Sequence, residues 1–358
     1  MSLDKESVQK ALGQVRYPGY SRDIVSFGLV KGIEVTLDGK VTVGLAVTSG
    51  DPAIPKQLYA EVEAVLKAIG VTKPEIAITV TVPKSAPGVP AVTTTPANAG
   101  VGQVKHIVAV ASGKGGVGKS TFAVNLACAL ARSLTEQGRP GRVGLMDCDI
   151  YGPSVPLMIG VNARPTMEGD VLLPLENFGV KIMSMGLLID ADAPVVWRGP
   201  MIMKTISQFA TNVRWGELDV LLIDLPPGTG DAQLSIAQAM ALSGAVIVTT
   251  PQTAAVSVAL RGAAMFGKVS VPILGVAENM SFFEGSDGQR QYLFGQGGGL
   301  RVATALNTEL LGEVPLDQTV RQGGDHGIPV VISHPDGNPA RVFKSVALTV
   351  LKKLEEAG

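Results

Sequence analysis

This chain has few cysteines and few charged residues, and neither sign of charge is in excess. Its 358 residues include two cysteines, Cys128 and Cys148, too few for a disulfide framework and two short of a four-thiolate metal site within one chain. Charged residues make up 17% of the chain and the net charge is -1. The chain therefore lacks the excess of positive charge that would favour binding to nucleic acid, and it has no polybasic run that would favour binding to an anionic membrane. We therefore expect small-molecule or protein partners.

Long hydrophobic runs are also absent. No apolar run reaches the roughly 18 residues of a membrane span, and the N-terminal sequence MSLDKESVQKAL lacks the charged-then-apolar pattern of a signal peptide. We expect a cytoplasmic location. Hydrophobic residues make up 46% of the chain, which excludes a disordered solvating protein and favours a globular α/β protein.

The length of the chain favours two domains joined by a linker. Residues 85–103 are rich in Pro, Ala, Thr and Gly and carry no charge, which predicts the linker. Residues 1–84 are predicted to form a small α+β domain, in which Asp38-Gly39 is a hairpin turn. Its expected elements are a helix at 5–12, strands at 32–37 and 40–46, a helix at 55–69 and a strand at 75–82.

Residues 104–358 alternate short β-branched runs with helical segments, which predicts βαβ units and a mostly parallel sheet with flanking helices. Ligands of such folds bind at the carboxyl ends of the strands. The expected strands are 106–111, 142–147, 219–224, 245–250 and 273–277.

A glycine-rich loop follows the first of these strands and reads GKGGVGKST. Its backbone N–H groups and the following helix N-terminus predict a cradle for phosphate. Lys119 is expected to reach the β- and γ-phosphates and Ser120 to ligate Mg²⁺. The alternative is a chance glycine-rich turn with an exposed lysine. The predicted nucleotide-binding residues are Gly113, Lys114, Gly115, Gly116, Val117, Gly118, Lys119, Ser120 and Thr121, and the helix face expected on the sheet is Phe122, Leu126, Leu130 and Leu134.

Carboxylates end two of the predicted strands. Asp147 ends the strand at 142–147 and Asp149 lies two residues beyond it. One carboxylate is expected to serve the attacking water and the other Mg²⁺; capping of the strand end is the alternative. Asp224 ends the apolar run DVLLID and is predicted to be a Walker B-like metal carboxylate, followed by a turn that could sense the γ-phosphate. Asp231 either closes that turn or caps the next helix.

The loop KGGVGK, with its additional lysine Lys114, resembles the deviant Walker A motif of the nitrogenase iron protein, ParA, MinD and Mrp group. The segments DIYGPS, VWRGPM and DLPPGTGD resemble the Mrp and Nbp-type branch, the iron–sulfur cluster carrier ATPases, over residues 104–358. This resemblance implies a P-loop NTPase that hydrolyses ATP as a homodimer and exchanges clusters with donor or recipient proteins. Trp197 and Arg198, in VWRGPM, are packing or functional positions.

The same resemblance implies roles for individual residues. Lys114 would contact nucleotide phosphate across a dimer interface, although a solvated loop charge is the alternative. Asp149 would orient the attacking water and Asp147 would belong to the metal shell, and the sequence leaves open which of the two dominates hydrolysis. Asn279 would bind the adenine base through its side-chain amide. A family loop near the base is matched by Pro315 and Asp317.

The cluster-binding cysteines of the family have no counterpart here. The carriers usually have CPxC after the NMS element, so that two subunits hold a bridging [4Fe–4S] cluster, whereas this chain has Gly285 and Gly288 there. The N-terminal segment DIVSFGLVKGIEV resembles a MIP18-type domain, and there Ile54 precedes Pro55 where relatives often have Cys-Pro. The iron–sulfur ligands are therefore unknown.

The two cysteines that are present have several possible roles. Cys128 is expected to be a small core residue. Cys148 is an inert thiol, a reactive thiol or a single cluster ligand. Two copies of Cys148 in a dimer cannot supply four thiolates, so a nitrogenase-like redox role is not favoured.

Three functions remain open. The first is an ATP-dependent iron–sulfur cluster carrier that transfers clusters to apoproteins. The second is a cluster-free ATP-dependent protein switch, which the missing cysteines favour. The third is a partition or division ATPase, for which the amphipathic C-terminal helix could seek membrane; Glu355 and Glu356 oppose an anionic surface. A packed helix with Phe343, Leu348 and Leu351 on its apolar side, together with Leu354, is the better interpretation.

Overall fold

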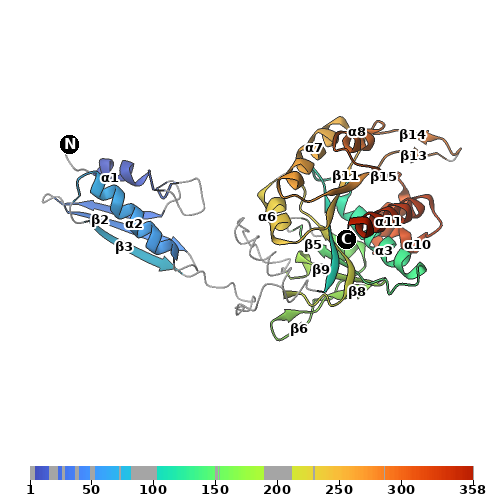
Figure 1. Cartoon of the computed structure of the whole chain (residues 1–358), viewed down its shortest axis with the longest axis horizontal. Coiled ribbons are helices and arrows are strands. Elements are labelled where there is room, and N and C mark those ends of the chain that lie inside the picture. Colours follow the sequence, from blue (N-terminus) through green and yellow to red (C-terminus); the bar gives the residue numbers. More distant parts are fainter. Residues whose placement is uncertain are drawn as a thin grey trace. The chain divides into compact units, whose positions relative to one another are not determined.

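The computed structural model divides into two compact units, Met1–Val92 and Thr93–Gly358 (Figure 1). It describes residues 5–15, 23–25, 29–36, 40–48, 53–71, 74–81, 103–149, 152, 154–188, 212–228, 230–285 and 287–357. The predicted turn Asp38-Gly39 and nearly all of the predicted linker lie outside these residues. The boundaries of the predicted domains, 1–84 and 104–358, stay a prediction.

The N-terminal unit is a three-stranded sheet with two helices on one face. Alternate residues of β2 are buried because strand side chains point to opposite faces, and the buried set packs on both helices. β1 and β2 are antiparallel, whereas β2 and β3 are parallel and are joined through α2. All five predicted elements are present: α1 (Lys5–Leu12), β1 (Val30–Val35), β2 (Val41–Thr48), α2 (Ala53–Ala68) and β3 (Pro74–Thr81).

The C-terminal unit is built on an eight-stranded sheet in the order β15-β12-β11-β4-β10-β5-β9-β8. Every neighbouring pair is parallel except β8 and β9. The strands are β4 (Val104–Ala111), β5 (Val143–Asp147), β8 (Leu175–Asn177), β9 (Val180–Ser184), β10 (Leu218–Asp224), β11 (Gly244–Thr249), β12 (Ile273–Glu278) and β15 (Leu310–Glu313). Two small antiparallel hairpins stand outside this sheet: β6 (Met167–Glu168) with β7 (Val171–Leu172), and β13 (Phe283–Glu284) with β14 (Arg290–Gln291).

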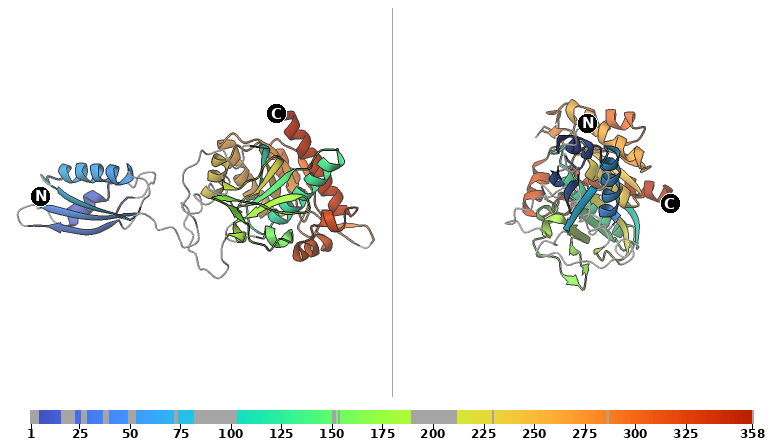
Figure 2. Two further views of the ribbon diagram at one scale, coloured as in Figure 1. Left: turned by 90° about the horizontal axis from the view of Figure 1, so that it is seen from below. Right: turned by 90° about the vertical axis from the view of Figure 1, so that its left-hand side faces the viewer.

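Helices cover both faces of the large sheet (Figure 2), and the core is accordingly split into two layers. Inner strands such as β4 are buried on both sides, so successive residues enter opposite layers: Val108 and Val110 face one, Ile107 and Ala109 the other. The helices are α3 (Lys119–Glu136), α4 (Val155–Met158), α6 (Asp231–Ala239), α7 (Thr253–Lys268), α8 (Gly298–Ala305), α9 (Gln318–His326), α10 (Val330–Ser333) and α11 (Asn338–Ala357), with a 3-10 turn at Met185–Leu187.

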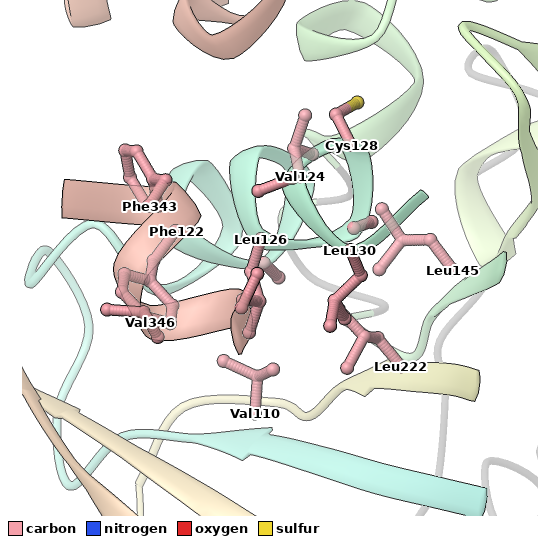
Figure 3. Packing of buried hydrophobic residues seen from close by; sticks show 14 of the residues in the cluster. Val110, Phe122, Val124, Leu126, Cys128, Leu130, Leu145, Leu222, Phe343 and Val346 are labelled. Atoms are coloured by element: carbon pink, nitrogen blue, oxygen red, sulfur yellow. The ribbon is translucent and has the colours of Figure 1, made fainter. Parts of the chain in front are cut away.

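The helix after the glycine-rich loop, α3, is the centre of one layer (Figure 3). Its predicted sheet-facing residues Phe122, Leu126, Leu130 and Leu134 are all buried, as four-residue spacing on one helix face predicts. Phe122 also packs against Phe343 of α11, with the ring centroids 5.4 Å apart. The C-terminal helix is therefore part of the core that supports the loop.

The prediction from sequence was wrong about one residue of α11, and it missed three strands of the large sheet as well as the two small hairpins. Leu348 of α11 is 41% exposed, while Val346 and Val350 are buried, because the buried stripe of the helix runs through those positions. β8, β9 and β15 were not predicted, because β8 and β15 have only three and four residues and Lys181 interrupts the apolar run of β9. Within the described residues, no helix is long and apolar enough to cross a membrane.

Candidate functional site

The glycine-rich loop connects β4 to α3 at the carboxyl edge of the sheet. Gly116 and Gly118 have φ angles of +81° and +76°, a left-handed conformation that side chains with a Cβ rarely adopt. Gly118 is the N-cap of α3, and no side chain caps the helix there. The N-terminus of the helix, which carries the positive end of the helix dipole, therefore adjoins the loop. This geometry is that of an anion cradle.

Two glycines of the loop are fixed by what lies against them. A Cβ on Gly113 would come within 2.3 Å of the carbonyl carbon of Val258 in α7, and one on Gly118 would lie 2.2 Å from Nδ2 of Asn279. The loop is therefore in direct contact with α7 on one side and with the segment after β12 on the other.

Lys119, Ser120 and Asp224 form the centre of the site. Nζ of Lys119 donates to Oδ1 of Asp224 at 2.5 Å, and the Ser120 hydroxyl donates to Oδ2 of the same carboxylate at 2.6 Å. Lys119 is 5% exposed and Asp224 is fully buried, so the ion pair is shielded from solvent. Burial raises the pKa of Asp224, against the opposing charge of Lys119.

A second carboxylate lies beside this pair, because Asp147 ends β5 in register with Asp224 of β10. Asp147 is fully buried and accepts hydrogen bonds from the Ser184 hydroxyl, at 2.8 Å, and from the Asp149 backbone N–H, at 3.0 Å. Burial, followed by the charge of Asp224, raises its pKa to about 7. The two buried carboxylates supply hard oxygen donors, and a single lysine offsets only part of their negative charge, so the site favours a divalent cation.

The structure brings together the residues predicted to act on phosphate and metal, but it gives Asn279 a different contact. Nδ2 of Asn279, predicted to pair with adenine, donates to the backbone oxygen of Val117 at 2.9 Å. Asn279 therefore braces the glycine-rich loop. The predicted base loop lies against the same segment, since Leu316 N donates to Phe282 O. Asp317 of that loop caps α9 through the N–H of Thr319, at 2.7 Å.

The turn after Asp224 also reaches the loop. The backbone N–H of Gly228 donates to the carbonyl of Ser112, at 3.1 Å, which links the turn predicted to sense the γ-phosphate to the start of the cradle. Asp231 begins α6, and its side chain lies outside the description, as do Trp197 and Arg198.

Three residues of this region were not identified from the sequence. Ser184 is the last residue of β9, a strand that was not predicted, so nothing in the sequence marked it. Gln252 lies 3.4 Å from Nζ of Lys114, through its Oε1, and polar residues directly after the strand predicted at 245–250 were a signal for it. Glu278 is fully buried, accepts from the Ser281 hydroxyl at 2.5 Å, and also accepts from the N–H of Gly299 at the start of α8.

The position of the family's missing cysteines is a tight hairpin. Gly285 N donates to Gln289 O and Gly288 N donates to Gly285 O, each at 2.9 Å. Asp287 accepts from the Gln289 N–H at 3.0 Å, so its carboxylate serves the turn. The described residues contain no group of three His, Cys, Asp or Glu side chains that could hold a metal ion.

The two thiols are buried in different layers of the core. Cys128 packs with the α3 layer, as predicted, and Cys148 with the layer on the other face of the sheet. Burial raises the pKa of Cys128 to about 12 and, with the charge of Asp147, raises that of Cys148 well above its usual range. Both are therefore protonated and shielded, which favours an inert Cys148.

Comparison with known proteins agrees with this geometry. Residues 103–351 match the family model described as NUBPL iron-transfer P-loop NTPase, and residues 5–77 match that of iron-sulfur cluster assembly proteins. An iron-sulfur cluster carrier protein of Synechocystis sp. is 42% identical over 99% of each chain. An iron-sulfur protein required for mitochondrial NADH dehydrogenase in Arabidopsis thaliana is 51% identical over 71% of this chain and 80% of its own length.

Among solved structures, a nucleotide-binding protein from Archaeoglobus fulgidus in complex with ADP is similar. It is 36% identical to this chain, with a TM-score of 0.57, over 66% of this chain and 91% of its own. The similarity covers a length close to that of the C-terminal unit.

Proposed function

Because the chain belongs to the family of NUBPL iron-transfer P-loop NTPases, we propose that it is an ATP-hydrolysing iron–sulfur cluster carrier that delivers clusters to apoproteins. The observation that carries the ATPase part is the convergence of Lys119 and Ser120 on the buried carboxylate of Asp224 beneath the glycine-rich loop. Iron–sulfur donor and recipient proteins, and a second copy of the chain, are the proposed partners. A cytoplasmic location is part of the proposal.

The residues fit bound ATP and Mg²⁺ as follows. A nucleotide phosphate would replace Asp224 as the partner of the Lys119 ammonium. The loop N–H groups from Gly113 to Thr121 would bind the phosphate oxygens. Ser120, Asp147 and Asp224 would hold Mg²⁺, which neutralises charge on the phosphates when bound. Deprotonation of Asp147 then becomes favourable, because the cation offsets the repulsion of the two carboxylates.

The remaining residues act on water, phosphate charge and the base. Asp149 would orient the attacking water, and its backbone N–H, bonded to Asp147, ties its position to the metal site. Lys114 would stabilise charge on the phosphates of nucleotide bound by the second copy, a role that is typically worth about 10³ to 10⁵ in rate for an arginine finger. Asn279 would hold the loop and present its free amide face to adenine.

Lys119→Ala tests the assignment of the phosphate site. It should abolish ATP binding measured by calorimetry, because the phosphates lose their buried cation. Lys105→Ala is the matched control, since Lys105 pairs with another buried carboxylate, Asp219, at 2.7 Å and at the opposite end of the same strands. Unchanged ATP affinity in Lys119→Ala, or an equal loss in Lys105→Ala, would refute the assignment.

Asp149→Asn tests the hydrolytic role. The amide keeps the size of the side chain but is a poor base and acceptor, so ATP should still bind while single-turnover hydrolysis slows by roughly 10² or more. Near-normal hydrolysis would assign the attacking water to another residue, with Asp147 the next to test.

The burial of both thiols and the compact hairpin at Gly285 and Gly288 favour a second candidate, a cluster-free ATP-dependent protein switch. Anaerobic reconstitution with iron and sulfide, with Cys148→Ser alongside, separates the two. About four irons per dimer with visible absorbance would support a carrier, since one [4Fe–4S] cluster would then bridge two subunits. A colourless protein with intact ATPase activity would support the switch.

A further inference from the structure

The lysine that distinguishes this loop, Lys114, is held by a residue of its own chain. Its Nζ lies 3.4 Å from Oε1 of Gln252, and both side chains are half-buried. Gln252 is the N-cap of α7 but makes no side-chain hydrogen bond to that helix. Its carboxamide is instead turned to Lys114.

Both ends of this contact are anchored. On the loop side, the Ser112 hydroxyl donates to the carbonyl of Lys114 at 3.1 Å, and Gly113 lies directly against the α7 backbone. On the other side, Arg301 donates to the carbonyl of Pro251 at 3.2 Å. Because contacts hold the backbone on both sides, we expect the contact to break by movement of side chains rather than of the loop or α7.

The contact competes with the role proposed for Lys114. An ammonium held at its own loop is not available to nucleotide bound by a second copy. A single hydrogen bond of this kind biases a side chain by roughly twofold to tenfold, which is enough to control how often the lysine is available without preventing its release.

Resting on the proposed function, we propose that Gln252 is a positioning residue for Lys114. Its carboxamide holds the Lys114 ammonium by a hydrogen bond near the phosphate loop of the same chain. Nucleotide bound to the partner copy then attracts the ammonium and breaks that hydrogen bond. The neutral carboxamide makes the hold weak and reversible, whereas a carboxylate at this position would make it strong.

Gln252→Ala and Gln252→Glu test this in full-length protein, with and without Lys114→Ala. With Gln252→Ala, kcat for ATP should rise by roughly 2- to 5-fold; with Gln252→Glu it should fall by about tenfold, because a carboxylate adds the attraction of an opposite charge to the hydrogen bond with the ammonium. KM and ADP affinity should not change, and both effects should vanish in the Lys114→Ala background. A fall in kcat with both variants, or effects that persist without Lys114, would overturn the proposal.

A second measurement does not depend on turnover. The rate at which an amine-reactive ester acylates Lys114 in nucleotide-free protein, followed by mass spectrometry with Lys352 as an exposed reference, should rise in Gln252→Ala and fall in Gln252→Glu. Equal acylation of Lys114 in all three proteins would overturn this role of Gln252 even if ATP is hydrolysed. Absence of hydrolysis with the expected change in acylation would instead refute the proposed ATPase function and leave the contact in place.

Discussion

At the scale of single residues, the site concentrates negative charge in the core. Asp147 and Asp224 are fully buried on adjacent strands, and the pair is balanced by Lys119 alone among the cations that contact it in the described structure. Buried carboxylates that are not fully paired favour the protonated form. The arrangement lowers the stability of the nucleotide-free protein and favours the binding of a cation.

Asp147→Asn should therefore stabilise the nucleotide-free protein at high pH. The pKa of Asp147 is raised from 3.8 to about 7, so the folded state binds its proton more tightly than the unfolded state, and stability falls as pH rises from about 4 to 7. The asparagine removes this loss, which gives a gain on the order of 2 kcal/mol at pH 8 and much less at pH 4.5. Urea unfolding at both values measures it.

The exposed Asp336 provides the control for that experiment. Asp336→Asn should change stability by about 0.5 kcal/mol or less at either pH. A gain from Asp147→Asn that is equal at pH 4.5 and pH 8 would contradict the pKa shift as its cause.

The cysteines should be unreactive in the folded protein. Both thiols have raised pKa values and are fully buried, and the thiolate is the nucleophile. We expect no alkylation by iodoacetamide at pH 7.5 over an hour in native protein and complete alkylation of both in urea. Rapid labelling of native wild-type protein that disappears in Cys148→Ser would instead identify Cys148 as an accessible thiol.

At the scale of elements, the predictions succeeded where a periodic pattern was long. The strands at 106–111 and 219–224 and the helix from Lys119 are present because burial on both sheet faces, or on one helix face, leaves a clear pattern. β9 was missed because Lys181 interrupts its apolar run, and Ser184, which donates to Asp147, was missed with it. The contact of Asn279 with Val117 could not be predicted either, since it joins residues 162 positions apart.

The packing of α11 gives a direct test at this scale. Phe343→Ala should destabilise the protein by about 3–5 kcal/mol, because it removes a ring that is 1% exposed and leaves a cavity beside Phe122. Leu348→Ala, on the exposed side of the same helix, should change stability by about 0.5 kcal/mol or less. Thermal unfolding compares the two, and equal losses would refute the observed orientation of the helix.

At the scale of the whole molecule, each of the two units has its own buried core. The N-terminal core is built from α1, α2 and the three-stranded sheet, and the C-terminal one from the two layers around the large sheet. The composition of 85–103 predicts a linker between the two, and those boundaries stay a prediction. What the small unit contacts could not be predicted, because its sequence carries no catalytic motif.

A fragment of residues 104–358 should bind ADP with the affinity of the full chain, within about twofold, because every residue proposed to contact nucleotide lies in it. Calorimetry on both proteins measures this. A fragment of residues 1–84, studied in parallel, should show its own cooperative thermal transition. A loss of ADP affinity of tenfold or more in a folded 104–358 fragment would show that the small unit contributes to the nucleotide site.

The end of β12 is hydrogen-bonded to two separate parts of the C-terminal unit. Glu278 accepts a hydrogen bond from the first turn of α8, and the next residue, Asn279, donates one to the glycine-rich loop. Because these two hydrogen bonds come from neighbouring residues, we expect α8 and the glycine-rich loop to undergo local opening together. Nucleotide that immobilises the loop should therefore also slow amide hydrogen exchange at Gly299, in a helix that the nucleotide does not touch.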